Sequence, residues 1–187
     1  MVESRKYISK EEYLQRIKNL QKRMQAEDID ILLTHACECE SANVRYLSGF
    51  WAVFDFAGVL VPREGNAILL TGGPESYDFA VQFANLDDIR IHPMYVETCA
   101  PEWDKPTNPY DFKKILDEFR EKFPIKKIAV ANSNIIPHNI FEDLKKGAGD
   151  AEIVLRDDII IKERTFKSPK ELELLREAYR ITEEALK

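Results

Sequence analysis

The stretch from Asn43 to Val61 constrains the fold of this chain more than any other part of the sequence. It begins as a short helix-like turn and breaks at Ser48-Gly49, because glycine can adopt backbone angles that are closed to other residues. An aromatic-rich run, Phe50 to Phe56, follows and predicts a strand, and an apolar run, Val59 to Val61, comes soon after it. No other stretch is as apolar and aromatic, so we expect its strands to be central in a sheet.

A single carboxylate, Asp55, lies within the aromatic part of this stretch. A carboxylate among Trp51, Phe54 and Phe56 needs either solvent on its face or a hydrogen-bonding partner, because an unpaired buried charge is costly. We therefore predict that the segment serves both as core and as the wall of a site. The sequence offers no specific partner for Asp55.

Hydrophobic periodicity predicts alternating strands and helices along the chain. Strands are expected at 29–34, 67–71, 89–96, 127–131 and 152–155, in addition to those of the central stretch. Helices are expected at 9–24, 74–84 with Val81 on the inner face, 108–123, 137–146 with Gly147 as the stop, and 159–166. Residues 97–108 hold two prolines and no periodicity and are interpreted as a loop. The turn at Gly65 predicts a hairpin, so the fold class is α/β, with a mixed β-sheet flanked by helices.

The last helix begins at a strong start signal, Ser168-Pro169-Lys170-Glu171, which is a capping box with proline at the first helical position. Its apolar arc consists of Leu172, Leu174, Leu175, Ala178, Tyr179, Ile181, Ala185 and Leu186. A helix of this length is marginal alone in water, so the arc should pack on something. Two alternatives stay open: the helix docks on the preceding domain, or it is the first helix of a following domain.

Composition argues against several function classes. The net charge is −6 and the pI about 5.3, which argues against a nucleic-acid-binding surface, because such surfaces use Lys and Arg to neutralise phosphates. No run reaches the length of about 18 apolar residues that suggests a membrane span, and the polar N-terminus lacks the apolar region of a secretory signal. Three cysteines without disulfide-like spacing agree with a reducing compartment, so we expect a cytoplasmic protein.

The cluster His35-Ala-Cys37-Glu38-Cys39-Glu40 has the ligand types that zinc prefers, but its spacing is poor for a metal site. Cys37 and Cys39 are interpreted as small apolar side chains instead. The segment 71–76 lies between a strand and a helix, where phosphates can bind, yet it matches no phosphate-binding motif and Glu75 would repel an anion. A plain helix start is the preferred interpretation.

The remaining candidate groups do not assemble a catalytic set. Asp87-Asp88 and Asp157-Asp158 lie next to predicted strand ends, where turn and cap roles are expected. His92 and His138 each adjoin a proline and are interpreted as surface or cap residues. No serine has a nucleophile elbow. We therefore predict no catalytic residue and no metal ligand in this chain, and a domain that binds or supports rather than catalyses by itself.

Two blocks of sequence carry a family resemblance. The first is Asn43-Val-Arg-Tyr-Leu-Ser-Gly-Phe, continued by Ala57-Gly-Val-Leu-Val-Pro62 and the return Ala67-Ile-Leu-Leu. The second is Ile161-Lys-Glu-Arg-Thr-Phe-Lys-Ser-Pro-Lys-Glu-Leu172, followed by Arg176-Glu-Ala178. Together with the first helix, which includes Arg16, they resemble the N-terminal domain of the creatinase/prolidase family, which contains Xaa-Pro aminopeptidases, Xaa-Pro dipeptidases and creatinases.

The resemblance implies a three-layer α/β domain over residues 1–166 and, at 167–187, the first helix of a C-terminal catalytic domain missing from this sequence. In that family two divalent metal ions, commonly manganese or cobalt, are bound in the catalytic domain, so none of their ligands is expected here. The N-terminal domain shapes the cleft for a peptide or small amide substrate and supports a homodimer. It also lends residues to the partner's site. By this resemblance Trp51, Phe54, Asp55 and Phe56 are the candidate substrate-binding residues.

Three functions are compatible with the resemblance. The first is the non-catalytic N-terminal domain of a metal-dependent Xaa-Pro peptidase, inactive when isolated as these 187 residues. The second is the same domain of a creatinase-like, metal-free C–N hydrolase. Creatinases carry a Phe and an Arg in the segment, and the absence of Arg between Gly49 and Pro62 counts against creatine. The third is a non-enzymatic, peptidase-like module that binds a protein or peptide.

Overall fold

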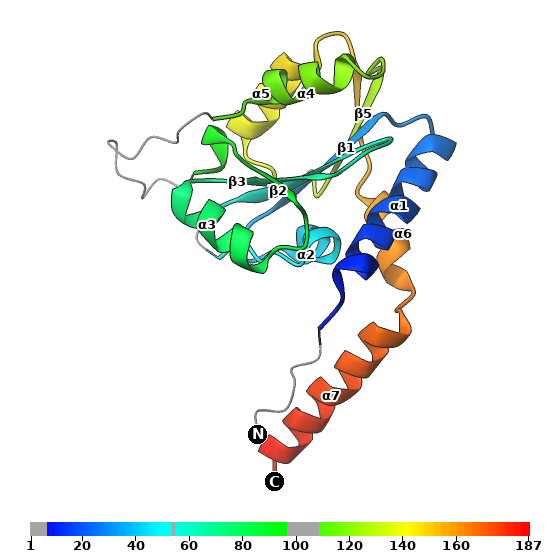
Figure 1. Cartoon of the computed structure of the whole chain (residues 1–187), viewed down its shortest axis with the longest axis vertical. Coiled ribbons are helices and arrows are strands. Elements are labelled where there is room, and N and C mark those ends of the chain that lie inside the picture. The colour runs from blue at the N-terminus through cyan, green and yellow to red at the C-terminus, as the bar shows by residue number, and fades with distance from the viewer. Residues whose placement is uncertain (1–6, 54, 97–108) are drawn as a thin grey trace.

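The computed structural model describes residues 7–53, 55–96 and 109–187 of the chain (Figure 1). These residues form a three-layer α/β body from which the last helix projects (Figure 1). Among the described residues, no helix is both long and apolar enough to cross a bilayer.

A mixed sheet of six strands forms the middle layer, in the order β4-β3-β2-β1-β5-β6. The strands are β1 Ile31–Ala36, β2 Ala57–Pro62, β3 Ile68–Thr71, β4 Asp88–Ile91, β5 Lys127–Ala131 and β6 Glu152–Leu155. The neighbours β1–β2 and β2–β3 are antiparallel, whereas β3–β4, β1–β5 and β5–β6 are parallel. The predicted hairpin and the central place of β2 are both confirmed.

Both faces of the sheet are covered, which explains why β1 and β2 have continuous buried runs rather than alternation. Leu32 packs in the cluster formed with α1 (Lys10–Ala26), α2 (Ala42–Ser48), α3 (Pro74–Phe83) and α6 (Asp158–Thr165). Leu33 packs in the opposite cluster, with α4 (Phe112–Arg120) and α5 (His138–Ala148). Successive residues of a strand point to opposite faces, so one strand supports both cores.

The helix expected at 108–123 is present as α4, and an apolar stripe along it faces the core. The members of this stripe, all buried in the α4/α5 cluster, are Phe112, Ile115, Leu116, Phe119 and Phe123. The helix itself begins later than expected, after the cap residue Asp111, whose carboxylate accepts from the Lys114 amide at 2.7 Å. Residues 97–108, which include Trp103 and Cys99 and were predicted to be a loop, lie outside the described residues.

The aromatic strand predicted for Phe50 to Phe56 is wrong: the described residues of this segment are irregular, and β2 begins only at Ala57. At its start, the Ser48 hydroxyl accepts from the Phe50 amide at 3.1 Å, which turns the chain. Ala57 is the first residue of β2, and the pairing with β1 and β3 begins there, so within the described ranges neither strand extends alongside the aromatic segment. The predicted break is confirmed, because Gly49 ends α2 with φ 75°.

Three smaller predictions also differ from the structure. The strand expected at 89–96 ends at Ile91 and gives way to a short 3-10 helix, Pro93–Tyr95. Gly147 does not stop α5, which continues to Ala148; a Cβ on Gly147 would lie 2.7 Å from the Phe112 carbonyl carbon, so this glycine permits close packing on α4. Val81, expected on the inner face of α3, is exposed.

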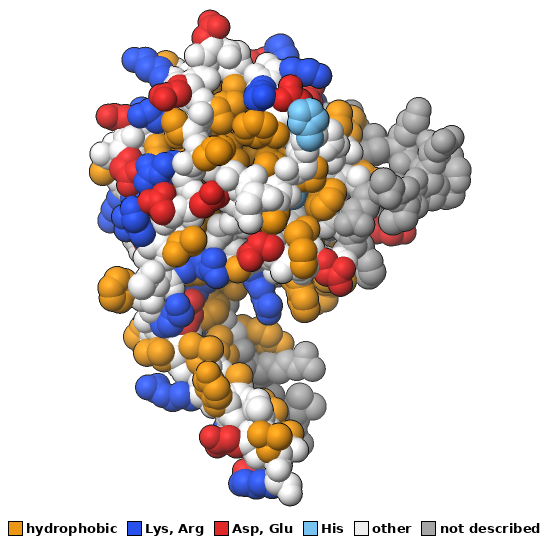
Figure 2. Space-filling model, turned by 180° about the vertical axis from the view of Figure 1, so that it is seen from behind, with side chains coloured by type: hydrophobic (Ala, Val, Ile, Leu, Met, Phe, Trp, Pro, Cys, Tyr) orange, Lys and Arg blue, Asp and Glu red, His pale blue; other side chains and the backbone are white. Residues whose placement is uncertain are grey.

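The last helix, α7 (Pro169–Ala185), leaves the body and projects away from it (Figure 1). The predicted capping box is present, formed by Ser168 and Glu171. None of its residues is buried. The large apolar side chains exposed on it and just beyond it are Leu172, Leu175, Tyr179, Ile181 and Leu186. Figure 2 shows apolar side chains gathered along this helix. In the structure α7 is therefore not docked along the body, which was the first of the two alternatives.

Candidate functional site

The aromatic segment presents Trp51 at the surface, with 47% of its area exposed. The guanidinium of Arg45, on the neighbouring helix α2, lies 5.3 Å from the centre of the Trp51 ring, within the range of a cation–π contact. Phe54, another predicted site residue, lies outside the described residues. Trp51 is thus held beside α2 with a large apolar surface open to a partner.

Asp55 has a specific structural role at the start of α3. Its carboxylate accepts from the Gly73 amide at 3.1 Å and from the Ser76 hydroxyl at 2.5 Å. Negative charge is favourable at a helix N-terminus, where backbone amides lack helical partners. The carboxylate also lies close to the backbone of Gly72. A Cβ at this position would lie 2.6 Å from the Asp55 Cγ, so glycine is required there. Asp55 therefore anchors the aromatic segment to the start of α3 through these hydrogen bonds.

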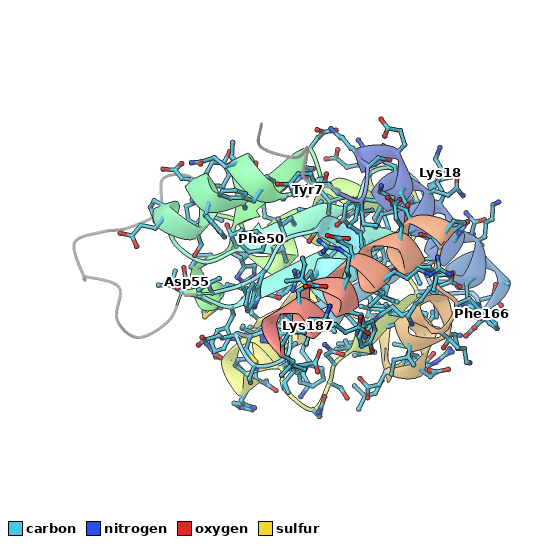
Figure 3. The ribbon with its side chains drawn as sticks, turned by 90° about the horizontal axis from the view of Figure 1, so that it is seen from below. Tyr7, Lys18, Phe50, Asp55, Phe166 and Lys187 are labelled. Atoms are coloured by element: carbon cyan, nitrogen blue, oxygen red, sulfur yellow. The ribbon has the colours of Figure 1, made fainter. Side chains whose placement is uncertain are left out.

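This arrangement also answers the question of phosphate binding at 71–76. The position that an anion would take at the N-terminus of α3 is used by the chain's own carboxylate, from Asp55. Figure 3 labels Asp55 at the edge of the body and Phe50 further inside it. The plain helix start that we preferred is confirmed, since α3 begins at Pro74.

Phe56 turns inward and packs against the α4/α5 cluster. Its ring centre lies 5.3 Å from that of His35, which is fully buried in β1 and also lies 5.5 Å from the Tyr95 ring. Burial without a charged partner lowers the pKa of His35 to about 4. His35 is therefore a neutral core residue in a ring cluster, whereas Cys39 is exposed. Among the described residues no group of three His, Cys, Asp or Glu side chains could hold a metal ion.

His92 has the cap role that we expected but not the surface location. Its Nδ1 accepts from the Met94 amide at 3.3 Å at the start of the 3-10 helix, and its side chain is fully buried. Burial lowers the pKa of His92, against the opposing effect of the Asp143 carboxylate, which lies 3.2 Å from Nε2. The predicted surface location of His92 is wrong because the adjacent Pro93 indicates a turn but does not indicate which elements cover that turn.

The pair Asp157-Asp158, for which turn and cap roles were predicted, lies at the start of α6, where Asp157 has the N-cap position without a side-chain cap hydrogen bond. Asp157 accepts from the amide and hydroxyl of Ser133 at 2.8 and 2.9 Å, joining the ends of β5 and β6. Asp158 forms ion pairs with Arg156 and Lys162, and these cations hold its pKa well below the usual range. Asp157 and Asp158 thus organise structure at this edge.

A groove of about 910 Å³ lies between the first half of α7 and the body. Its walls come from α1, α2, the end of α3 and α7, with Tyr13, Arg45, Phe83, Lys167, Leu174 and Leu175 among the lining residues. Arg45 also contacts Trp51, so the exposed aromatic ring lies next to a residue that lines this groove. The lining combines apolar and cationic side chains with the carboxylate of Glu171.

The base of the groove is a polar junction centred on Arg16, which is only 7% exposed. Its guanidinium donates to the Tyr46 carbonyl at 2.9 Å and to the Glu12 carboxylate at 2.8 Å. It also lies 3.3 Å from Glu171 in the first turn of α7. The same Glu12 carboxylate accepts from the Ser168 hydroxyl at 2.8 Å, so α1 holds the start of α7 through two contacts.

A second polar chain joins α6 to α2 and the sheet. The Arg164 guanidinium donates to the Asn43 side-chain oxygen at 2.8 Å, and the Asn43 amide group donates to Asn132 at 2.7 Å. Asn132 in turn donates to the His35 carbonyl at 3.0 Å. Asn43 is 1% exposed, so a polar side chain here needs these partners. The two sequence blocks singled out above, far apart in the chain, therefore meet in one junction.

The sequence pattern predicted neither set of contacts. Arg16 and Asn43 stood out only as members of motifs. For Arg16 a signal exists, because it falls on the apolar stripe of the first helix, between Tyr13 and Leu20, and a polar side chain on a buried stripe requires partners from elsewhere in the fold. Asn43 has no comparable local signal.

Comparison with known proteins gives one family match. The description "Creatinase/Prolidase N-terminal domain" matches residues 16–165. An Xaa-Pro dipeptidase from Pyrococcus horikoshii is 25% identical over 172 residues, which are 92% of this chain and 40% of that protein. The chain spans well under half the length of the curated relatives that it matches.

Two solved structures are similar in fold. The prolidase from Pyrococcus horikoshii OT3 matches with a TM-score of 0.62 and 24% identity, over 92% of this chain and 41% of that one. An Xaa-Pro aminopeptidase from Streptococcus pyogenes matches with a TM-score of 0.54 and 16% identity, over 82% of this chain and 98% of that one. The second match shows that a chain of about this domain's extent has been solved on its own.

Proposed function

Because the chain belongs to the creatinase/prolidase N-terminal domain family, we propose that it is the non-catalytic N-terminal domain of an Xaa-Pro dipeptidase or aminopeptidase. In this role it shapes the cleft for a peptide or small amide substrate and contributes to a homodimer in the cytoplasm. Hydrolysis is carried out by a second domain. The similarity to the dipeptidase from Pyrococcus horikoshii supports the assignment of substrate class.

The observation that carries this proposal is the uncovered apolar face of α7. Tyr179 is 68% exposed and Ile181 56%, although both belong to the arc that a stable helix of this length should bury. The capping box and the contacts of Arg16 and Ser168 nevertheless set the direction of this helix. We propose that residues 167–187 are the first helix of the catalytic domain and that this domain covers the exposed face.

The metal chemistry of the family is assigned to that second domain. The described residues offer no group of three potential ligands, and His35, the best donor of the predicted cluster, is buried among Phe56 and Tyr95. The described residues therefore do not fit a two-metal site, and we derive no catalytic step from them. Two divalent ions, manganese or cobalt, belong to the proposal only as cofactors of the second domain.

Within the whole enzyme we propose that the segment Trp51–Phe56 forms part of the substrate wall, with Trp51, Phe54, Asp55 and Phe56 as its members. The exposed Trp51 ring offers the contact surface, and its stacking with Arg45 fixes its orientation. Asp55 contributes by anchoring the segment to α3, and Phe56 by anchoring it to the core. An exposed ring on a segment held from both ends is suited to a preorganised wall.

The test uses the whole protein that carries this domain, assayed with an Xaa-Pro dipeptide and manganese or cobalt. We expect Trp51→Ala to raise KM about tenfold, which corresponds to about 1.4 kcal/mol of lost binding, with kcat little changed. Leu155→Ala is the matched control, because Leu155 is also an exposed apolar side chain but lies on β6. Equal kinetics for the two variants would contradict the role of the wall.

The 187-residue chain alone provides the second arm of this test. We expect it to hydrolyse no Xaa-Pro dipeptide, with or without manganese. Turnover by a clean preparation would contradict the assignment of catalysis to another domain. If the whole protein binds the dipeptide without hydrolysing it, the alternative of a peptide-binding module is favoured instead.

A further inference from the structure

A pair of thiols lies at the tight turn that follows β1. The turn is closed by two backbone hydrogen bonds between Cys37 and Glu40, each 3.2 Å long. Within it the sulfur atoms of Cys37 and Cys39 lie 3.2 Å apart, with Cys39 exposed and Cys37 partly exposed. The backbone therefore brings two accessible sulfur atoms together at the surface.

The separation of the sulfur atoms distinguishes between a metal and a covalent bond. Two thiolates on a tetrahedral zinc ion, each at about 2.3 Å from the metal, would be about 3.8 Å apart. A disulfide requires about 2.05 Å, and the observed 3.2 Å lies below the distance expected with a metal. In addition, His35 cannot act as a third ligand, because its ring is buried with Phe56 and Tyr95. The geometry favours bond formation between the two sulfur atoms over shared coordination.

We propose that Cys37 and Cys39 form a reversible dithiol–disulfide pair, oxidised by a low-molecular-weight disulfide. One protein thiolate attacks a sulfur of the small disulfide, forming a mixed disulfide and expelling one small thiolate. The second cysteine, after losing its proton, attacks the protein sulfur of that mixed disulfide and expels the other small thiolate. Overall, two protein thiols lose two protons and two electrons, and the small disulfide gains them and becomes two thiols.

The charge around the turn predicts which disulfide reacts. Glu38 and Glu40 flank Cys39, so they repel an anionic disulfide and attract a cationic one. The hydrogen bond with Cys37 and the charge of Glu40 also raise the pKa of the Cys39 thiol. We therefore expect oxidation to accelerate with rising pH and to be faster with cystamine, which is cationic, than with oxidised glutathione, which is anionic.

The location of the pair links its oxidation state to the junction described above. The Glu40 carboxylate that ends the turn accepts from the Ala42 amide at 3.1 Å, where α2 begins. The next residue, Asn43, holds Arg164 of α6. A disulfide would thus restrict the segment that leads from the central strand into this junction.

The test uses the full chain with Cys99→Ser, so that only the two thiols of the turn remain. The protein is equilibrated with cystamine and cysteamine, quenched with acid, and measured by intact mass and peptide mapping. We expect loss of two hydrogens, without any adduct, and a peptide containing the Cys37–Cys39 bond. Single variants Cys37→Ser and Cys39→Ser in the same background should instead carry one cysteamine adduct each.

Two results would overturn the proposal. The first is two stable cysteamine adducts on the Cys99→Ser protein, which would show that the thiols react independently. The second is a protein that stays reduced in a buffer that modifies both single variants. For the charge argument, we expect cystamine to react about tenfold faster than oxidised glutathione at low salt, with the ratio falling at high salt. Equal rates at low salt would contradict the role of Glu38 and Glu40.

Discussion

Helices α4 and α7 both carry apolar stripes of helical spacing, yet only the stripe of α4 is buried. Phe112 and Leu116 of α4 are fully buried against the sheet and α5. Leu175 and Tyr179 of α7 are 44% and 68% exposed. The difference teaches that an amphipathic pattern reports the need for a partner, whereas only the tertiary structure shows whether the partner is in the same chain.

The strongest test of this comparison removes one large side chain from each helix. We expect Phe112→Ala to lower the free energy of unfolding by about 3–5 kcal/mol, because a large buried ring is replaced by a cavity. Tyr179→Ala should change it by less than about 0.5 kcal/mol, as at other exposed positions. Urea unfolding of the two variants measures both values. Similar losses would mean that α7 is covered in solution, for instance by a second copy of the chain.

The second test concerns His35, a buried titratable residue on the α4 side of the sheet. His35 stays neutral in the folded chain because its pKa is lowered from 6.5 to about 4. Above pH 6.5 His35 is neutral in both the folded and the unfolded chain, so its titration does not change the free energy of unfolding. As the pH falls from 6.5 toward 4, His35 becomes protonated in the unfolded chain but not in the folded chain. The free energy of unfolding should therefore fall by about 3 kcal/mol.

His35→Leu is the variant that isolates this effect. It keeps an apolar side chain in the ring cluster and removes the titration, so the loss of stability between pH 6.5 and 4 should become shallower. His92 keeps part of the slope in the variant, because burial lowers its pKa as well. Chemical unfolding at several pH values measures the slope. An unchanged slope would contradict a buried neutral His35.

The smallest expected effect concerns the helix caps. Ser168→Ala removes the cap of α7 and its contact with Glu12, and a lost cap typically costs about 1 kcal/mol. Since no side chain of α7 is buried, we expect faster hydrogen exchange of its first-turn amides without a change in the exchange of the body. Ser9→Ala is the matched control on α1, whose Ile17, Leu20 and Met24 are buried.

We expect α1 to keep its slow exchange after loss of its cap, because packing holds the rest of the helix. If both variants fray their helices to the same degree, burial of the α1 stripe contributes less to helix stability than the comparison assumes. If neither helix frays, the contact of Arg16 with Glu171 is sufficient to hold the start of α7.

The sequence predicted the fold class and most elements because their signals are local. Strands Lys127–Ala131 and Glu152–Leu155 coincide with the predicted ranges, and the capping box at Ser168 is present. The failure at Phe50–Phe56 has a clear reason. Aromatic residues favour strands, but a strand also needs neighbours with free backbone groups, and pairing with β1 and β3 ends at Ala57.

The candidate site was predictable only in part. Trp51 was named from the sequence and is exposed, but Arg45, which lines the groove and contacts the Trp51 ring, was not named. Asp55 was recognised as a charge in need of a partner, and its partners, Gly73 and Ser76, lie on another element. Such contacts join residues that are distant in sequence, so no local pattern encodes them.

By itself, the sequence determined the order of strands and helices, the hairpin that makes the sheet mixed, and the apolar stripes of the helices. These follow from periodicity, turn residues and caps, which act within a few residues. Only the tertiary structure decided that Arg16 meets Glu171 at the start of α7, that Asn43 meets Arg164 of α6, and that α7 leaves the body uncovered. Burial and pairing depend on which surfaces the folded chain brings together, and that is a property of the whole fold.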